Sequence, residues 1–562
     1  MVYLPPNSAL DPAFWTPQNI LVASGTALLA LILLVIRYPK DLIGTSRRSH
    51  NVLSLPSALP LLGDTLLALQ ISFKQKKLLD EILYHQHRVG KGGRPVSITF
   101  PSLGARQYIL NMPQYVHYCQ KTDFETFAKG DNFHRRLSDL LGEHGIFVVD
   151  GEPWKRQRKM ASHIFSVGNF RTCVQQTIDI DLTKMERLLN NVARENVSIN
   201  LPDLFFRFTL SSFSQLAFSA DVECLPETVQ GLNVRNSFAD AFDFAQLVAD
   251  ERFVAIFPLW FEHFTPTGFK MRKALKTLRT YCYRTIDLRL SARARGENRG
   301  AVDSKNGKDL LELFIDMGLS RKELLPVVLN FLIAGRDTTA QSLSWFFLEI
   351  ASHPEVVQKI REEIQDSFSD RLNESHLTYD DMKQLPYLQA AFYEAIRLHP
   401  AVPKNIKQAT QDTVIRPYAT NDIDGKRDLP GGGTKEPLPD ITIKKGESVI
   451  WSDYVMARMP EIWGNDCAEY KPERFLETRD GKTSVRQFSQ AIFHAFNAGP
   501  RVCLGQTLAT YEGMAVIVAI LTNFDIIYDY EKLKTDPPTF AESLTHPIQN
   551  PYSVRVQRRN NH

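Results

Sequence analysis

The segment from Phe496 to Gly505 constrains the fold of this chain most strongly, because it holds one cysteine in a short run flanked by glycines. Glycine tolerates a positive φ, so Gly499 and Gly505 let the backbone turn closely around the Cys503 sulfur. Residues 506–523 predict a helix, which would put Cys503 near a helix N-terminus, where a thiolate is stabilised. We therefore expect a shielded, deprotonated sulfur with backbone N–H groups directed at it.

A thiolate of this kind can act as the axial ligand of a haem iron, and an arginine two residues before it can meet a haem carboxylate. The spacing Phe-x-x-Gly-x-Arg-x-Cys-x-Gly resembles the haem-binding loop of cytochrome P450 enzymes. The resemblance implies that haem b is bound, with Cys503 as the iron ligand. It also implies that four further loop residues contact the cofactor, namely Phe496, Gly499, Arg501 and Gly505. The alternative is a buried structural cysteine in a loop before a helix.

The composition excludes several other classes of protein. Among 562 residues, 66 Lys and Arg face 63 Asp and Glu, and the formal charge of +3 gives no electrostatic argument for nucleic-acid binding. Six scattered cysteines without a C-x-x-C pair argue against a zinc site or a disulfide framework, and they suggest a reducing compartment. We expect one large, mainly α domain with small β-sheets over residues 65–562, which the resemblance identifies with the cytochrome P450 fold.

The N-terminal region predicts a membrane anchor. Residues 20–36 carry no charge, and the length of this run is just enough to span a thin bilayer. No Lys or Arg precedes the run and Arg37 follows it, so residues 1–19 should be lumenal and the rest cytosolic. The alternative is a buried core helix. Residues 37–64 form a basic, proline-rich segment that resembles the hinge of microsomal P450s, which implies a single-pass protein of the endoplasmic reticulum. The sequons at Asn196 and Asn373 would then face the cytosol and stay unmodified.

A tryptophan and an arginine share one helix face upstream of the cysteine loop. A helix should start after Pro153, because proline suits the first helical position, and Trp154 and Arg158 are then one turn apart. In the P450 family this Trp-x-x-x-Arg pair meets a haem propionate, and the resemblance carries that role to both residues. Lys407 stands where the family often has a further basic residue directed at a propionate. Without the resemblance, a stacked surface pair would be the simpler interpretation.

A long apolar segment contains a short polar run. Ser320 and Glu323 form a capping-box pattern, and the helix should continue to His353, with Pro326 kinking it or marking its start. Within it, the run 334–340 resembles the oxygen-binding motif of the family. Gly335 would let a ligand lie against the helix. The resemblance implies catalytic roles for Thr338, as hydrogen-bond donor to bound dioxygen, and for Asp337, as proton relay. Threonine can also bond a carbonyl one turn earlier.

Two separated motifs predict a buried ion network. Glu394 and Arg397 lie three residues apart on a helix, an arrangement that is common on surfaces. The run Pro-Glu-Arg-Phe at 472–475 follows later in the chain. Together they resemble the P450 pairing in which one glutamate and two arginines lock the core around the haem loop. Glu394, Arg397 and Arg474 would form this structural network here.

The resemblance implies a monooxygenase that inserts one oxygen atom from O2 into a C–H bond of a hydrophobic substrate. NADPH would act indirectly, through NADPH–cytochrome P450 reductase, with or without cytochrome b5. The motifs resemble the fatty-acid and alkane hydroxylase branch of fungi and plants. The stretches 238–244 and 543–547 fall where the family shapes its substrate pocket. Terpenoid, steroid or aromatic hydroxylation, a haem-thiolate isomerase or dehydratase, a haem carrier or gas sensor, and a membrane protein without haem are the alternatives.

Overall fold

The computed structural model describes residues 16–73, 77–163, 165, 174–220, 222, 224–296, 309–369, 371, 376–417 and 429–559. The sequon at Asn373 and most of the segment expected to be lumenal lie outside these ranges. Asn196 lies within them, as the exposed residue that ends a helix in the left-handed conformation with φ of 51°.

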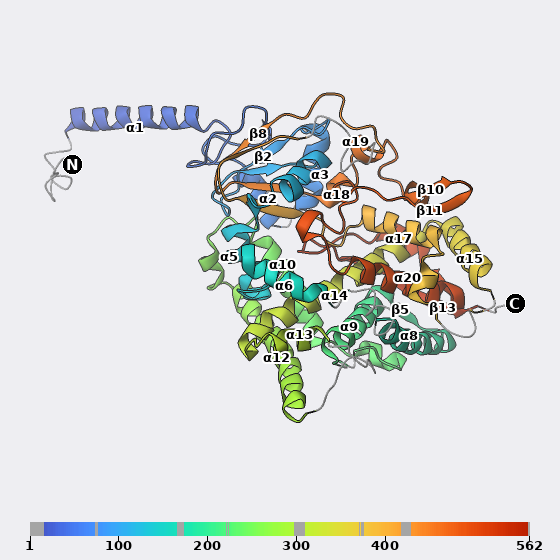
Figure 1. Cartoon of the computed structure of the whole chain (residues 1–562). Coiled ribbons are helices and arrows are strands. Elements are labelled where there is room, and N and C mark those ends of the chain that lie inside the picture. Colours follow the sequence, from blue (N-terminus) through green and yellow to red (C-terminus); the bar gives the residue numbers. More distant parts are fainter. Residues whose placement is uncertain are drawn as a thin grey trace.

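The N-terminal helix stands apart from the body of the molecule (Figure 1). Helix α1 spans Pro17–Arg37, with Pro17 at its first position and the Thr16 side chain accepting from Asn19 N. None of its residues is buried, although nearly all of them are apolar. The alternative of a buried core helix is therefore excluded. A helix of 21 residues rises about 31 Å, which is enough to cross the hydrocarbon core of a bilayer.

The segment after α1 is tied to the body of the molecule. Asp41 pairs with the fully buried Arg106 at 2.8 Å, and Leu55 is part of the core. Strand β1 (Leu53–Ser54) extends a six-stranded sheet, where it runs parallel to β2 (Val96–Ile98). Residues 37–64 are therefore packed against the domain that they precede.

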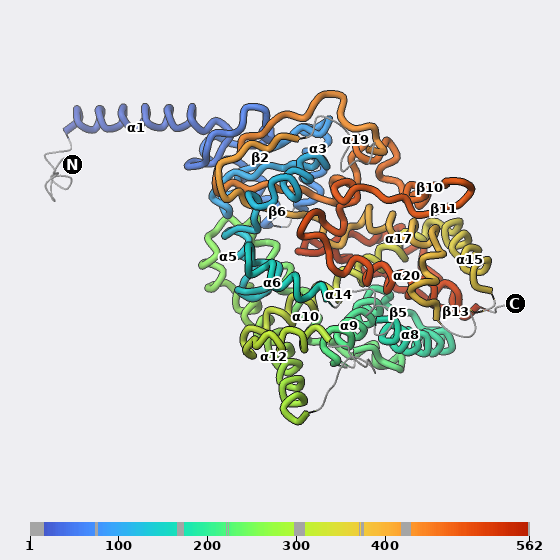
Figure 2. Tube along the Cα trace, in the orientation of Figure 1, coloured from blue at the N-terminus to red at the C-terminus, as the bar shows by residue number. Residues whose placement is uncertain are grey.

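The large sheet joins segments from distant parts of the chain. Figure 2 shows its N-terminal strands, in blue, beside orange strands from the C-terminal third. The strand order is β1-β2-β3-β9-β6-β4, in which β3 and β9 are parallel. The bounds of the other strands in this sheet are Gln107–Ile109 (β3), Phe127–Ala128 (β4), Asn405–Ala409 (β6) and Ser448–Trp451 (β9). The smaller sheets are β12-β13-β5 (Phe524–Tyr528, Ser553–Arg558, Ser198–Asn200), β10-β11 (Leu476–Arg479, Lys482–Val485) and β7-β8 (Thr413–Ile415, Ile441–Ile443).

Helices form most of the molecule, so the predicted mainly α fold with small sheets is confirmed. Apart from α1 and α14 (Arg321–Ala351), the longer helices are α3 (Leu78–Arg88), α5 (Gly130–Leu141), α6 (Gly151–Ser162), α8 (Gln175–Glu195), α9 (Leu201–Phe218), α10 (Ser237–Glu251), α12 (Pro266–Ala294), α15 (Pro354–Phe368), α17 (Pro386–Leu398) and α20 (Gln506–Asn523). The shorter ones are α2 (Thr65–Ser72), α4 (Pro113–His117), α11 (Leu259–Glu262), α13 (Leu310–Asp316), α16 (Tyr379–Met382), α18 (Asp453–Met456), α19 (Pro460–Trp463) and α21 (Tyr530–Thr535). Single turns of other helical types cover Tyr118–Thr122, Val229–Asn233, Pro472–Phe475 and Gly499–Arg501.

Helix α14 (Arg321–Ala351) runs through the middle of the molecule and packs against α9, α12, α17 and α20 (Figure 1). The predicted capping box is present, with Ser320 and Glu323 each accepting from the other's backbone. Pro326 lies in the second turn, so it does not mark the start of the helix. Only the first four N–H groups of a helix lack an intrahelical acceptor, so proline at this sixth position removes one helical hydrogen bond.

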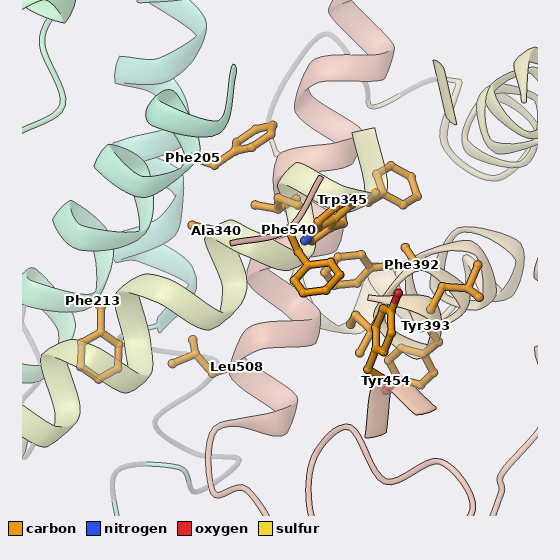
Figure 3. Close-up of a cluster of buried hydrophobic side chains, with 14 of the residues drawn as sticks. Phe205, Phe213, Ala340, Trp345, Phe392, Tyr393, Tyr454, Leu508 and Phe540 are labelled. Atoms are coloured by element: carbon orange, nitrogen blue, oxygen red, sulfur yellow. The ribbon is translucent and has the colours of Figure 1, made fainter. Parts of the chain in front are cut away.

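Aromatic side chains from several helices fill the core around α14. Figure 3 shows Trp345 and Phe392 close to Tyr454 and Phe540 from the C-terminal part of the chain, while Phe205 and Phe213 of α9 stand farther from this group. The rings of Phe205 and Phe347 are 5.2 Å apart, and those of Phe346 and Phe392 are 6.0 Å apart. These contacts hold α14 in a fixed position beside α9 and α17.

Candidate active site

A cavity of about 430 Å³ lies between α14 and the loop that precedes α20. Apolar side chains make up most of its wall, among them Phe100, Phe133, Phe242, Phe253 and Phe331. Polar residues interrupt this wall at several points, and two groups of them stand out. One group surrounds Cys503, and the other lies where α10 meets the segment 542–545. The cavity therefore combines a large apolar volume with a reactive sulfur.

Cys503 contributes its side chain to the cavity wall. The Cys503 N–H donates to Phe496 O at 2.8 Å, which closes the loop. Cys503 is exposed to the cavity rather than shielded as expected, yet desolvation by the protein atoms around it raises the pKa of its thiol above the ordinary value, whereas the backbone N–H groups of Gly505 and Gln506, together with Arg158, lower it. Helix α20 starts at Gln506, as the sequence predicts. The sulfur thus faces the cavity with the helix N-terminus behind it.

The two glycines of the loop serve different purposes. Gly499 has a φ of 63°, and a Cβ there would lie 2.2 Å from Gln120 O, so both conformation and space require glycine. Gly505 has a φ of −87°, so a positive φ is not the reason for glycine at this position, contrary to our expectation. Gly505 lines the cavity, and a Cβ there would come 3.8 Å from the Cys503 sulfur. Its side-chain hydrogen keeps the space beside the sulfur open.

Basic residues surround one side of the cavity near the sulfur. Lys129, Arg158 and Arg501 line it together with Trp154, which the two guanidinium groups approach at 5.9 and 4.4 Å from the ring centre. Arg158 donates to Val502 O at 2.6 Å. Helix α6 begins at Gly151, two residues before Pro153 rather than after it, and it still places Trp154 and Arg158 on one face. Arg501 also donates to Val149 O at 2.9 Å and to Asp150 at 2.7 Å.

Helix α14 contributes Thr338 to the wall opposite the basic group. The Thr338 hydroxyl donates to Ala334 O at 2.8 Å, as the sequence predicts. Asp337 is 1% exposed, and it is not among the described residues that line the cavity. Its carboxylate accepts from Gln246 at 2.6 Å and from Arg336 at 2.7 Å. Burial raises the pKa of Asp337 to about 6, although Arg336 opposes this shift.

An aromatic side chain of α9 occupies the space in which a Gly335 side chain would lie. A Cβ on Gly335 would come 2.1 Å from the ring of Phe213, which therefore occupies that space. Both residues line the cavity. Glycine at this position therefore also lets α9 pack closely on α14, and the contact of a ligand with Gly335 stays a prediction.

Comparison with known proteins decides the family. The family model described as Cytochrome P450 matches residues 93–420 and 436–554, which is most of the chain. The chain is a cytochrome P450. Cytochrome P450 monooxygenase cyp1 of Mycosarcoma maydis is 37% identical over 551 residues, covering 94% of this chain and 79% of that protein. Cytochrome P450 86B1 of Arabidopsis thaliana is 33% identical over 434 residues, covering 74% and 71%. Cytochrome P450 94A1 of Vicia sativa is 28% identical over 532 residues, covering 93% and 94%.

Membership of this family implies a haem-thiolate cofactor, and the residues of this P450 fit one. Lys407 is 3% exposed, and its Nζ finds no hydrogen-bond partner among the described residues, nor does Arg501 Nε. Burial, together with Lys129 and Arg501, places the pKa of Lys407 well below its ordinary value. Such buried cations require anionic partners. Asp150 is a single carboxylate beside these basic groups, and two haem carboxylates would supply further negative charge.

Lys129 belongs to the same basic group, and sequence analysis missed it. Burial lowers the pKa of Lys129 to about 7, and repulsion by Arg501 adds to the effect. Lys129 comes just before α5, and no motif surrounds it. Its position beside Arg501 depends on the way the segment before α5 folds back onto the cysteine loop. A lysine before a glycine carries no signal that would reveal this contact.

The three charged residues expected to lock the core lie together in the structure. Arg397 contacts Glu394 through two hydrogen bonds of 2.6 and 2.8 Å, and Arg474 donates to Glu394 at 3.2 Å. Glu394 is fully buried, and Lys471 N also donates to it at 3.0 Å. The arginines reach backbone carbonyls of residues 457, 463, 466, 467 and 469. The network thus joins α17 to the segment that leads toward the cysteine loop.

The two stretches expected to shape the substrate pocket contribute to the cavity in part. Phe242 lines it, while Phe238 lies behind Phe242 with stacked rings whose centres are 6.2 Å apart. Leu544 and Thr545 line it from the C-terminal stretch. Gln246 was not singled out from the sequence, yet it lines the cavity and holds Asp337. Its role depends on α10 lying across α14, which no local pattern reveals.

Proposed function

We propose that this P450 monooxygenase hydroxylates aliphatic chains of the fatty-acid or alkane type. The observation that supports this most is the cavity, which reaches the Cys503 sulfur. Its wall is mostly apolar and includes Phe100 and Phe331. Haem would fill the part of this cavity beside Cys503, and the apolar wall beyond it would bind an apolar chain by removing the surface of that chain from water. Terpenoid, steroid or aromatic hydroxylation is the alternative that the same wall permits.

Haem, when bound, supplies the reductive activation of dioxygen and the transfer of one oxygen atom to a C–H bond. Cys503 would hold the iron through its sulfur, with the N–H groups of Gly505 and Gln506 stabilising the thiolate. Trp154, Arg158 and Arg501 would meet the propionates. Lys407 would join them because its Nζ is buried beside the Phe124 ring and has no hydrogen-bond partner among the described residues.

Protons would reach the cavity through α14. The Thr338 hydroxyl faces the cavity and can turn from Ala334 O to donate into it. Asp337 would replenish that proton, since a carboxyl whose pKa is about 6 exchanges protons readily near neutral pH. Gln246 and Arg336 hold the carboxylate in place. The network of Glu394, Arg397 and Arg474 has a structural role in this proposal.

Electrons would come from NADPH through NADPH–cytochrome P450 reductase, with or without cytochrome b5. We propose that α1 spans the membrane of the endoplasmic reticulum once, with residues 1–19 lumenal and the catalytic domain, after the segment 37–64, in the cytosol. The exposed apolar surface of α1 supports the anchor, and Arg37 in its last turn supports the orientation. If acidic groups of a reductase dock on basic residues, reduction should slow as salt is added.

The test has two parts. The full-length protein, reduced in the presence of carbon monoxide, should show the red-shifted Soret band of a thiolate-bound haem. It should then consume NADPH with a reductase when an aliphatic chain is added, and release a hydroxylated product. If the protein shows the thiolate band and hydroxylates terpenoids or steroids but no aliphatic chain, the proposed substrate class is wrong and the alternative class takes its place. Isomerised or dehydrated peroxide products would favour an isomerase or dehydratase, and a band without any turnover would favour a carrier.

A further inference from the structure

A charged cluster lies in the second polar group of the cavity wall. It consists of Lys404, Asp250 and Glu542, which we call the Lys404 cluster. Asp250 is the penultimate residue of α10 and lines the cavity together with Lys404, which precedes β6, while Glu542 lies behind them. Lys404 Nζ lies 2.8 Å from Asp250 Oδ2 and 3.2 Å from Glu542 Oε2. An ion pair of this kind is unusual in a wall built from aromatic and aliphatic side chains, and it makes this end of the cavity selective for polar groups.

The cluster has one unused hydrogen-bonding atom. An ammonium has three N–H donors, and those of Lys404 go to Asp250, Glu542 and, at 3.4 Å, Ser543 O. Glu542 Oε1 accepts from Leu79 N at 3.0 Å. Asp250 Oδ1 is buried and finds no donor among the described residues. The unsatisfied atom of the cluster is therefore an acceptor, and each N–H of Lys404 already has an acceptor, of which Ser543 O is the most distant.

The charges nearby do not favour an anion either. Lys404 faces two carboxylates, and Glu251 adds a further negative charge beside Asp250. Asp80 lies near both Lys77 and Glu542, and Arg458 and Lys77 add positive charge on the side of His546. His546 is buried, and burial lowers its pKa well below the ordinary value, so it adds no positive charge. A carboxylate placed here would meet more negative than positive charge.

The neighbouring polar wall residues are already committed to one another. Thr545 donates to Gln246 Oε1 at 3.2 Å and accepts from Gln341 at 2.9 Å, while Gln246 donates to Asp337. They leave Asp250 Oδ1 as the unsatisfied acceptor at this end. Because this atom is buried, the Asp250 side chain must rotate slightly before a ligand in the cavity can donate to it. A neutral hydroxyl offers what Asp250 lacks, which is a donor without a negative charge.

We propose that the aliphatic substrate carries a hydroxyl group at one end, and that this hydroxyl donates to Asp250 Oδ1. The substrate class is then a long-chain alcohol rather than a free fatty acid. This inference rests on the proposed function, because it requires an aliphatic chain in the cavity. The apolar wall holds the chain, and the Lys404 cluster selects the head group.

The test compares three ligands of one chain length on the full-length holoprotein at neutral pH. Lauryl alcohol offers a donor, methyl laurate offers acceptors alone, and laurate carries a negative charge. Binding is followed by the haem spin-state shift and by calorimetry. We expect lauryl alcohol to bind roughly tenfold or more tightly than methyl laurate, because a hydrogen bond to a charged acceptor is lost in the ester. Laurate should bind most weakly.

Two variants separate the hydrogen bond from the overall charge. Asp250→Asn weakens the acceptor, so the preference for alcohol over ester should fall by roughly tenfold. Glu542→Gln removes the same charge but leaves Asp250 Oδ1 unchanged, so this preference should persist. Both variants should improve laurate binding. Each is checked for the thiolate band and for its midpoint of thermal unfolding before comparison.

The outcomes are distinct. Laurate binding as tightly as lauryl alcohol would overturn the hydroxyl proposal and make Lys404 an anion site, while leaving aliphatic hydroxylation intact. An equal loss of the alcohol preference in both variants would overturn the hydrogen bond to Asp250. If no aliphatic ligand binds to protein that shows the thiolate band, the proposed function fails together with this inference.

Discussion

Thr338 and Asp337 are neighbours in α14, but their side chains leave the helix on different sides. Thr338 lines the cavity, whereas Asp337 is held by Arg336 and Gln246 away from it. We predict that Thr338→Ala will reduce the product formed per NADPH consumed by about tenfold or more, since a positioned proton donor contributes at least that much. Thr338→Ser keeps the hydroxyl and should retain most of the coupling. Unchanged coupling in Thr338→Ala would remove Thr338 from proton delivery.

A second residue-scale prediction concerns Asp64, which precedes α2. It accepts from Thr99 N at 2.7 Å, and burial raises its pKa to about 7. The folded state therefore holds this proton more tightly than the unfolded chain does. Protonated Asp64 therefore makes its full contribution to the free energy of unfolding below the ordinary pKa of a carboxyl. This contribution is lost as the pH rises toward about 7. The loss should amount to a few kcal/mol.

Thermal unfolding of the wild type and of Asp64→Asn, between about pH 5 and about pH 8, measures this effect. The amide cannot ionise, so the unfolding midpoint of the variant should rise relative to that of the wild type as the pH increases. A constant difference between the two midpoints across this range would mean that Asp64 is ionised throughout.

Single residues also show what the sequence could and could not predict. Cys503, Glu394 and Arg397 lie in short motifs whose spacing is set by one turn or one helix, so their placement was predictable. Lys129 and Gln246 act through contacts with segments far away in the chain, and nothing in their local sequence indicates those contacts. Phe213 covers Gly335 for the same reason. The α9–α14 contact decides which side chain fills that space.

At the scale of elements, the buried glutamate of α17 holds three parts of the chain together. Glu394→Gln would leave Arg397 and Arg474 without their shared counter-charge in a buried site. We predict a loss of about 3–5 kcal/mol of stability, together with weaker haem retention. Thermal unfolding and the thiolate band of the purified protein measure the two effects.

Asp466 provides a matched control, because it also contacts Arg474, at 3.1 Å, but is one-third exposed. Asp466→Asn should cost no more than about 1 kcal/mol, as for other pairs that water screens. Equal losses of stability in the two variants would show that Glu394 contributes no more to the ion network with Arg397 and Arg474 than a partly exposed carboxylate does. The elements were predictable here because both motifs are local, whereas the backbone carbonyls that complete the network were not.

At the scale of the whole molecule, the anchor and the catalytic domain meet at the segment after α1. The sequence predicted a connector over residues 37–64, and the structure packs much of this segment onto the domain. Leu55 is 1% exposed, and β1 adds a strand to the large sheet. Hydrophobic pattern alone could not show this, because prolines and a glycine give the segment the composition of a loop.

Two truncations test where the catalytic domain begins. Removal of residues 1–37 should release the protein from membranes and keep the thiolate band, because α1 has no buried residue. Removal of residues 1–64 also deletes Asp41, which pairs with the buried Arg106, and Leu55 from the core. We expect this longer truncation to lose several kcal/mol of stability through the stranded charge and the cavity left behind. Membrane fractionation, the carbon monoxide spectrum and thermal unfolding compare the two. If both truncations were equally stable, residues 38–64 would be a true hinge, and their contacts with the domain would contribute nothing to its stability.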